Sequence, residues 1–165
     1  MRFTAFMDKQ ALTRDVIAQL NAELALQTDA ANNAREEATN EESRAEDKYD
    51  MRSQSAAYLA AGQARLAGEI ADAIAAWQAV PVRAFGPGEE IAAGALVTLE
   101  AGGLRDRYFV GPHSGGLEAR AGEATAVVVT STSPLGRQLV GRRVGDQVIL
   151  TGRATLVTHR VVAVD

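Results

Sequence analysis

The hydrophobic positions of this chain follow two different patterns, one in each half. Between Gln10 and Val80 apolar residues recur three and four apart, there is no proline, and the only glycines are Gly62 and Gly68. From Pro81 onward the chain is rich in valine and holds thirteen of its fifteen glycines and all four prolines. The first pattern predicts amphipathic helices. The second predicts short strands joined by tight turns.

Two stripes of small and apolar residues in the first half predict a pair of packed helices. The first stripe comprises Ile17, Leu20, Leu24, Ala31, Ala34, Ala38 and Ala45. The second comprises Ala56, Leu59, Leu66, Ile70, Ala73 and Trp77, with Gln63 as its polar member. Heptad spacing of this kind is typical of coiled coils. Because the polar segment 46–52 separates the stripes, we expect the helices to fold back as an antiparallel hairpin.

The second half is expected to form a small, mostly β domain. Candidate strands are Ala95–Glu100, Arg107–Val110, Thr125–Ser131, Gln147–Thr151 and Leu156–Val164. One short helix is predicted over Pro134–Val140. Ser133 is its expected N-cap, Pro134 occupies the first helical position, and Gly141 ends it.

Charge is spread unevenly along the chain. The net charge is −4, and residues 36–50 hold seven acids against two bases. This acidic excess makes duplex DNA a poor partner. The acidic segment can be a solvated turn or a functional tip, and the sequence leaves both open.

There is no cysteine, so disulfides and Cys-based zinc sites are excluded. The chain shows no signal peptide or membrane span, and we expect a cytoplasmic protein with no membrane partner.

Three motifs occur in order in the second half. They are VTLE at Val97–Glu100, YFVGP at Tyr108–Pro112 and SPLGRQLVGRRVGDQVIL at Ser133–Leu150. Together they resemble the globular domain of the Gre family of bacterial transcript-cleavage factors. The resemblance implies an α+β protein of two domains. Residues 1–80 would form an antiparallel coiled-coil hairpin with an acidic tip near 41–50. Residues 81–165 would form an antiparallel β-sheet domain with a short helix, shaped like an FK506-binding protein.

The resemblance also implies a function. In the Gre family the globular domain docks at the rim of the RNA polymerase secondary channel, and the coiled coil reaches toward the active site. Acidic tip residues help to hold a second Mg²⁺, and the polymerase then cleaves its own backtracked RNA. This chain would therefore be a monomeric cofactor of RNA polymerase rather than an enzyme. Its partners would be the polymerase and, through the channel, the 3′ end of the nascent RNA.

The tip residues carry this resemblance only in part. Asp47 and Asp50 keep the family's Asp-x-x-acid spacing, and with Glu46 they are the candidate catalytic and Mg²⁺-binding residues. Tyr58 then lies four residues later than the family's tyrosine. Two outcomes are left open. The tip either promotes cleavage, or it occupies the channel without promoting it, as the inhibitory Gre-like proteins do.

Basic residues supply further candidates. Arg44, Lys48 and Arg52 are spaced four apart and are candidate contacts to RNA, or partners of nearby acids. In the globular domain, the candidates for docking on the polymerase are Arg137, Arg142, Arg143, Ser133 and Pro134. Solvation of a short helix is the alternative role for the arginines. Asp146 is expected to stabilise the adjacent turn.

Other functions find less support in the sequence. His113 and His159 have no second ligand at metal spacing. Prolyl isomerase activity would need an aromatic-lined pocket, but the second half offers only Phe85, Tyr108 and Phe109. A plain coiled-coil adaptor or dimerisation module is the remaining alternative. It predicts that the tip acids are dispensable.

Overall fold

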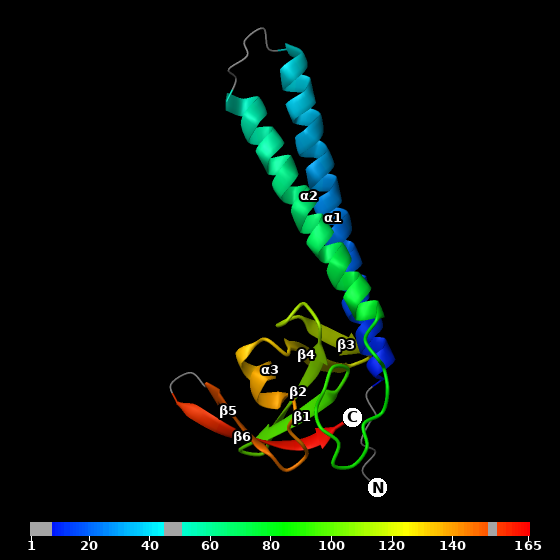
Figure 1. Ribbon diagram of the computed structural model, residues 1–165, viewed down its shortest axis with the longest axis vertical. Coiled ribbons are helices and arrows are strands. Elements are labelled where there is room, and N and C mark those ends of the chain that lie inside the picture. The colour runs from blue at the N-terminus through cyan, green and yellow to red at the C-terminus, as the bar shows by residue number, and fades with distance from the viewer. Residues whose placement is uncertain (1–7, 45–50, 152–154) are drawn as a thin grey trace. The chain divides into compact units, whose positions relative to one another are not determined.

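The computed structural model describes residues 8–44, 51–151 and 155–165 (Figure 1). Two long helices come first, followed by six strands and one short helix. In chain order the elements are α1 (Lys9–Arg44), α2 (Met51–Gln78), β1 (Leu96–Ala101), β2 (Leu104–Gly111), β3 (Glu118–Ala121), β4 (Ala124–Thr130), α3 (Pro134–Leu139), β5 (Gln147–Thr151) and β6 (Leu156–Val164). The predicted class is confirmed: a helix hairpin followed by a sheet domain with a short helix.

The six strands form one sheet in the order β3-β4-β2-β1-β6-β5. The prediction of a purely antiparallel sheet is wrong at one pair, because β2 and β4 run parallel from Tyr108 and Val127 onward. β3, which the sequence did not predict, explains the difference. After β2 the chain turns back along β3 at the outer position and then forms β4 between β3 and β2. β4 therefore runs in the direction of β2.

Contacts divide the chain into two units. The first comprises the residues up to Ile17 together with Ala76–Asp165, and the second comprises Ala18–Ala75. The first turns of α1 and the last residues of α2 thus belong with the sheet. No helix among the described residues is long and apolar enough to cross a membrane.

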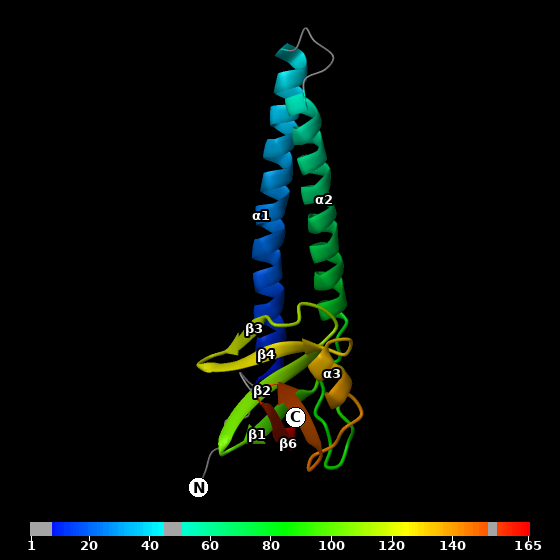
Figure 2. The same ribbon diagram turned by 90° about the vertical axis from the view of Figure 1, so that its left-hand side faces the viewer.

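In the second unit, α1 and α2 run side by side as a hairpin (Figures 1 and 2). The stripe predicted on α1 is confirmed where the structure describes it: Ala31, Ala34 and Ala38 are buried, and Leu24 is half-buried. Its last member, Ala45, lies outside the described residues. Alanine side chains allow two helix backbones to approach closely, although each buries little apolar area. Contact in this part of the hairpin is therefore made largely by alanine.

The stripe predicted on α2 is partly wrong. Leu59 and Leu66 are exposed, whereas Ala60 is buried and Ala67 is half-buried. Ala56, Gln63 and Ile70 are half-buried, as the heptad predicts, so the repeat itself holds. Its second position is displaced by one residue, about 100° around the helix, at Leu59 and Leu66, whereas Ala73 is buried as predicted. The smaller residue faces the partner helix, and the leucine faces water.

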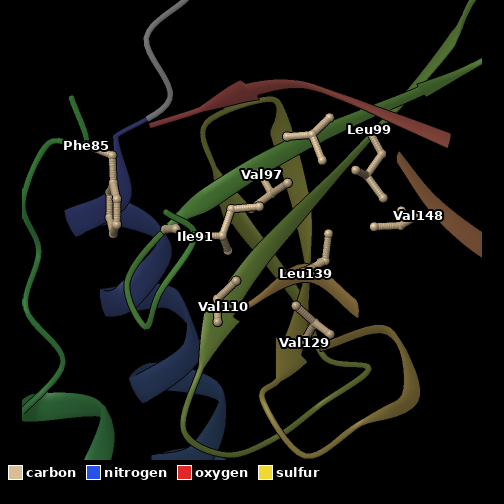
Figure 3. Packing of buried hydrophobic residues seen from close by; sticks show 10 residues of the cluster. Phe85, Ile91, Val97, Leu99, Val110, Val129, Leu139 and Val148 are labelled. Atoms are coloured by element: carbon tan, nitrogen blue, oxygen red, sulfur yellow. The ribbon is translucent and has the colours of Figure 1, made fainter. Parts of the chain in front are cut away.

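One face of the sheet carries the main core. Val97, Val110, Val129, Val148 and Leu139 are buried in a single cluster. Figure 3 shows Leu139 of α3 pointing in among the strand side chains. α3 therefore covers this face of the sheet.

The opposite face is covered by the helix ends that belong to the first unit. Phe109 and Val128 are paired in register and point away from the α3 side, because successive strand residues alternate. Trp77 of α2 is fully buried against Phe109, with ring centroids 5.4 Å apart. Leu12 and Val16 of α1 are also fully buried. Among the described residues, the Trp77 indole N–H has no hydrogen-bond acceptor.

Polar contacts also join the start of α1 to the rest of the first unit, which we call the sheet unit. Lys9 is buried, and its Nζ donates hydrogen bonds to the carbonyl oxygens of Arg83 and Gly94. Burial lowers the pKa of the Lys9 amine. Asp15 accepts a hydrogen bond of 2.9 Å from the backbone N–H of Arg120 in the edge strand β3. α1 thus satisfies part of an exposed sheet edge.

Gly111 is required by the Trp77 ring. A Cβ atom at Gly111 would overlap the indole, whereas a Cβ at Gly115 would meet Thr130 Cγ2 at an ordinary 3.5 Å. We expect Gly111→Ala to lower the free energy of unfolding by about 1–3 kcal/mol through overpacking. Gly115→Ala, the matched control, is expected to change it by less than about 0.5 kcal/mol.

Fluorescence of Trp77, the one tryptophan in the chain, measures both variants in urea. Equal midpoints for Gly111→Ala and Gly115→Ala would contradict the packing described here.

Candidate functional site

The predicted tip lies mostly outside the described residues. Glu46, Asp47, Lys48 and Asp50 belong to the segment 45–50, about which the structure gives no description. The backbone places Arg44 at the end of α1 and Arg52 in the first turn of α2. Within the described ranges, no group of three or more acidic or histidine side chains is arranged to hold a metal ion. The roles of the predicted tip residues in Mg²⁺ binding and RNA contact therefore remain predictions.

The second set of predicted residues surrounds α3, and its first member is the helix cap. Ser133 Oγ accepts a hydrogen bond of 3.0 Å from the Gly136 N–H and donates one of 2.8 Å to the Thr130 carbonyl. Pro134 follows at the first position of α3, as predicted. Ser133 thus caps α3 and fixes it to the end of β4. Its hydroxyl is used within the fold, while Pro134 is exposed.

Gly136 explains the glycine in the Ser-Pro-Leu-Gly sequence. A Cβ atom at this position would overlap the Thr130 carbonyl group. α3 can therefore approach the end of β4 only if residue 136 lacks a side chain. Leu135 packs against the core cluster at the same point. These residues determine where the following arginines are presented.

The turn after α3 is held by its own hydrogen bonds. Asp146 Oδ2 accepts a bond of 2.9 Å from the Arg143 N–H, which fulfils the predicted structural role of Asp146. The Arg142 carbonyl accepts a bond of 2.8 Å from the Ile91 N–H. Gly145, at φ 98°, has the left-handed backbone that favours glycine. The turn is thus joined to the core and to the segment before β1.

The side chains of this region form an exposed surface. Arg137, Arg142 and Arg143 are all exposed, and Val140 and Val144 are 43% and 51% exposed. We call these five residues the signature surface. The structure therefore brings the three predicted arginines into one short region. Sequence reasoning missed the two valines, although their positions beside the arginines in the motif were a usable signal.

The charges on the signature surface are not all equivalent. Arg143 forms an ion pair of 2.8 Å with Glu90, a partner that the sequence did not predict. The Arg142 side chain makes a long hydrogen bond of 3.4 Å, from Nε to the carbonyl of Gln138. Exposed ion pairs of this kind contribute little to stability. The surface therefore keeps a positive excess beside apolar side chains.

Gln138 is a further residue that sequence reasoning missed. Its side-chain amide donates to the Ile149 carbonyl at 2.9 Å and accepts from the Ile149 N–H at 2.8 Å. β5 is the last strand of the sheet. The Gln138 side chain thus satisfies both backbone groups of Ile149, as a neighbouring strand would. It protects this part of the open sheet edge and joins α3 to β5.

The two histidines are not part of the signature surface. His113 follows β2, and His159 lies in β6, where Nδ1 is 3.1 Å from the Val157 carbonyl oxygen. No metal-binding group forms around either among the described residues.

No protein-family model and no curated protein matches the chain. Several solved structures are similar, among them three of Gfh1. GreA factor homolog 1 (Gfh1) of Thermus thermophilus is 24% identical, covers 90% of this chain and 94% of its own, and gives a TM-score of 0.39. A second structure, of the transcription factor Gfh1, gives 24% identity, coverage of 90% and 92%, and a TM-score of 0.40. Gfh1 of Thermus aquaticus gives 26%, coverage of 89% and 92%, and a TM-score of 0.38.

The two hydrogen bonds between the Gln138 side chain and the Ile149 backbone should contribute to stability. We expect Gln138→Ala to lower the free energy of unfolding by about 1–2 kcal/mol, since two hydrogen bonds are lost and water replaces them only in part. Gln147→Ala, an exposed glutamine in β5, is the control and should leave stability nearly unchanged. Chemical denaturation measures both, and equal losses would show that the amide does not protect the strand.

Proposed function

We propose that this chain is a Gre-type regulator that binds RNA polymerase at its secondary channel through the sheet unit and presents the hairpin tip to the active site. The observation that carries the proposal is the signature surface. The Ser133–Leu150 motif, which resembles the Gre family, builds a capped helix and a fixed turn whose exposed side chains include arginine, valine and Pro134. Folding explains Ser133, Gly136, Gly145 and Asp146 of this motif. It does not explain the exposed arginines.

The chemistry of the signature surface suits an acidic protein surface. Valine side chains supply apolar contact, and arginine supplies directional hydrogen bonds to carboxylates. Duplex DNA is a poor alternative, because residues 81–165 carry only +1 overall, from nine basic and eight acidic residues. Residues 36–50 add a net −5, which would repel phosphates.

The proposed role of the tip follows from metal chemistry. Hydrolysis of a phosphodiester by two metal ions requires both ions to clamp the attacking and leaving oxygens. Mg²⁺ takes carboxylate and water oxygens as ligands. Asp47 and Asp50, with Glu46, would supply carboxylates to a second Mg²⁺ that the polymerase holds weakly. Arg44, Lys48 and Arg52 would contact the RNA near its 3′ end. The polymerase would remain the enzyme.

A second function is favoured by one observation. Tyr58 lies four residues later than the family's tyrosine when Asp47 and Asp50 are aligned, and its side chain is 87% exposed. A tip altered in this way can bind Mg²⁺ without positioning the attacking water. The chain would then occupy the channel and slow transcription instead of rescuing backtracked complexes.

The tip prediction is tested with a purified, backtracked elongation complex in Mg²⁺. We expect the wild-type chain to accelerate RNA cleavage and Asp47→Ala/Asp50→Ala to abolish the acceleration while still binding the polymerase. Slowed extension without cleavage would establish the inhibitory function. Absence of any effect and of any binding would contradict both.

The docking prediction uses charge reversal. We expect Arg137→Glu/Arg142→Glu to weaken binding to core polymerase by about 100-fold, since favourable contacts become repulsive. Arg107→Glu, at an exposed arginine of β2 in the same unit, is the matched control and should bind like the wild type. Fluorescence anisotropy of labelled chain measures both affinities. Equal weakening by both variants would point to a nonspecific charge effect and against the signature surface.

A further inference from the structure

Four large apolar side chains of α2 are exposed along one side of the helix. Met51 is 79% exposed, Tyr58 87%, Leu59 56% and Leu66 39%. At about 100° per residue these positions fall within a sector about 100° wide. Met51, Tyr58 and Leu59 line a hollow of about 580 Å³ together with Gln54 and Ser55. We call the four residues the α2 stripe.

The α2 stripe does not serve the packing of the hairpin. The positions that face α1 are held by Ala60, which is buried, and Ala67, which is half-buried. Leucine in those positions would bury more apolar area than alanine does. Instead the leucines lie one residue away, in water. A contiguous exposed apolar strip of this kind marks an interaction surface.

The charges on and beside the α2 stripe indicate which kind of partner could bind it. Residues 51–68 contain no aspartate or glutamate, whereas residues 21–44 hold six acids against two bases. Arg65 lies 3.9 Å from Glu69, so its charge is partly balanced. The charged residues of this segment are Arg52 and Arg65. The stripe is therefore an apolar surface free of acidic residues, beside an acidic helix. Nucleic acid would be repelled by α1. An uncharged apolar protein surface would not be.

The size of the α2 stripe argues against a second copy of this chain as the partner. Covering four such side chains removes on the order of 500 Å² from water on one side. Two copies would bury about 1,000 Å², below the roughly 1,200–2,000 Å² of stable specific interfaces. A contact of this size is effective when another surface already holds the partners together, because the second contact is then intramolecular.

We propose that the α2 stripe is a second attachment to RNA polymerase, made against an uncharged apolar part of its protein surface and separate from the signature surface. This inference rests on the proposed function, since the signature surface supplies the first attachment. The stripe would hold the α2 side of the hairpin against protein and leave the acidic α1 side free of that contact.

Affinity for core polymerase tests the contribution of the α2 stripe. We expect Tyr58→Ser/Leu59→Ser to weaken binding about 30-fold or more through loss of apolar contact. Leu26→Ser is the matched control, because Leu26 on α1 is 63% exposed and lies outside the stripe. It should bind like the wild type. Circular dichroism must show equal helicity in both variants.

Photo-crosslinking identifies what covers the α2 stripe. p-Benzoylphenylalanine is placed at position 58 or, as the control, at position 26, and a backtracked elongation complex is irradiated. We expect position 58 to crosslink to a polymerase subunit and position 26 to give little product. Crosslinks from position 58 to RNA, or to a second copy of the chain, would overturn the inference.

Binding to the polymerase and contact through the α2 stripe can be tested separately. A wild-type chain that does not bind the polymerase would remove the proposed function and the inference with it. A wild type that binds, together with a Tyr58→Ser/Leu59→Ser variant of unchanged affinity, would leave the proposed function intact and overturn the inference alone.

Discussion

The packing of Trp77 on Phe109, against the bare backbone of Gly111, is the contact on which the sheet unit depends. It buries the end of α2 on the face of the sheet opposite α3. Leu12 and Val16 of α1 are buried with it in the same unit. The sheet therefore has a second covered face only because both long helices contribute their ends to it. This explains why the sheet unit includes residues from both ends of the helical half of the chain.

The sequence predicted features that rest on local chemistry. Ser133 was expected to cap α3 and does so, because a serine before proline and a short helix has few other uses. The stripe on α1 was also correct, since alanines spaced three and four apart leave one choice of buried face. On α2 the choice lay between Leu59 and Ala60, adjacent residues that both fit a heptad. Only the spacing of the two backbones, a tertiary property, selects the alanine.

Other features were beyond the sequence for equally physical reasons. β3 has four residues, alternates charged residues with alanine, and lies between glycines, so it lacks the apolar signal of a strand. Gln138 protects Ile149 from eleven residues away in the chain. In the candidate site, the motif predicted the arginines, while Glu90 and the exposure of Val140 and Val144 followed from the fold. The tip acids lie outside the described residues, so their role rests on the resemblance and on Mg²⁺ chemistry.

The proposed function requires the hairpin tip to reach the metal centre of RNA polymerase. Localised radical cleavage tests it most directly: Fe²⁺ replaces Mg²⁺ at the polymerase active centre, and peroxide generates hydroxyl radicals there. With the end-labelled chain bound, the account predicts cuts near residues 41–52 and none in residues 81–165. A bound chain that is left uncut, or that is cut only in its sheet unit, would contradict the account.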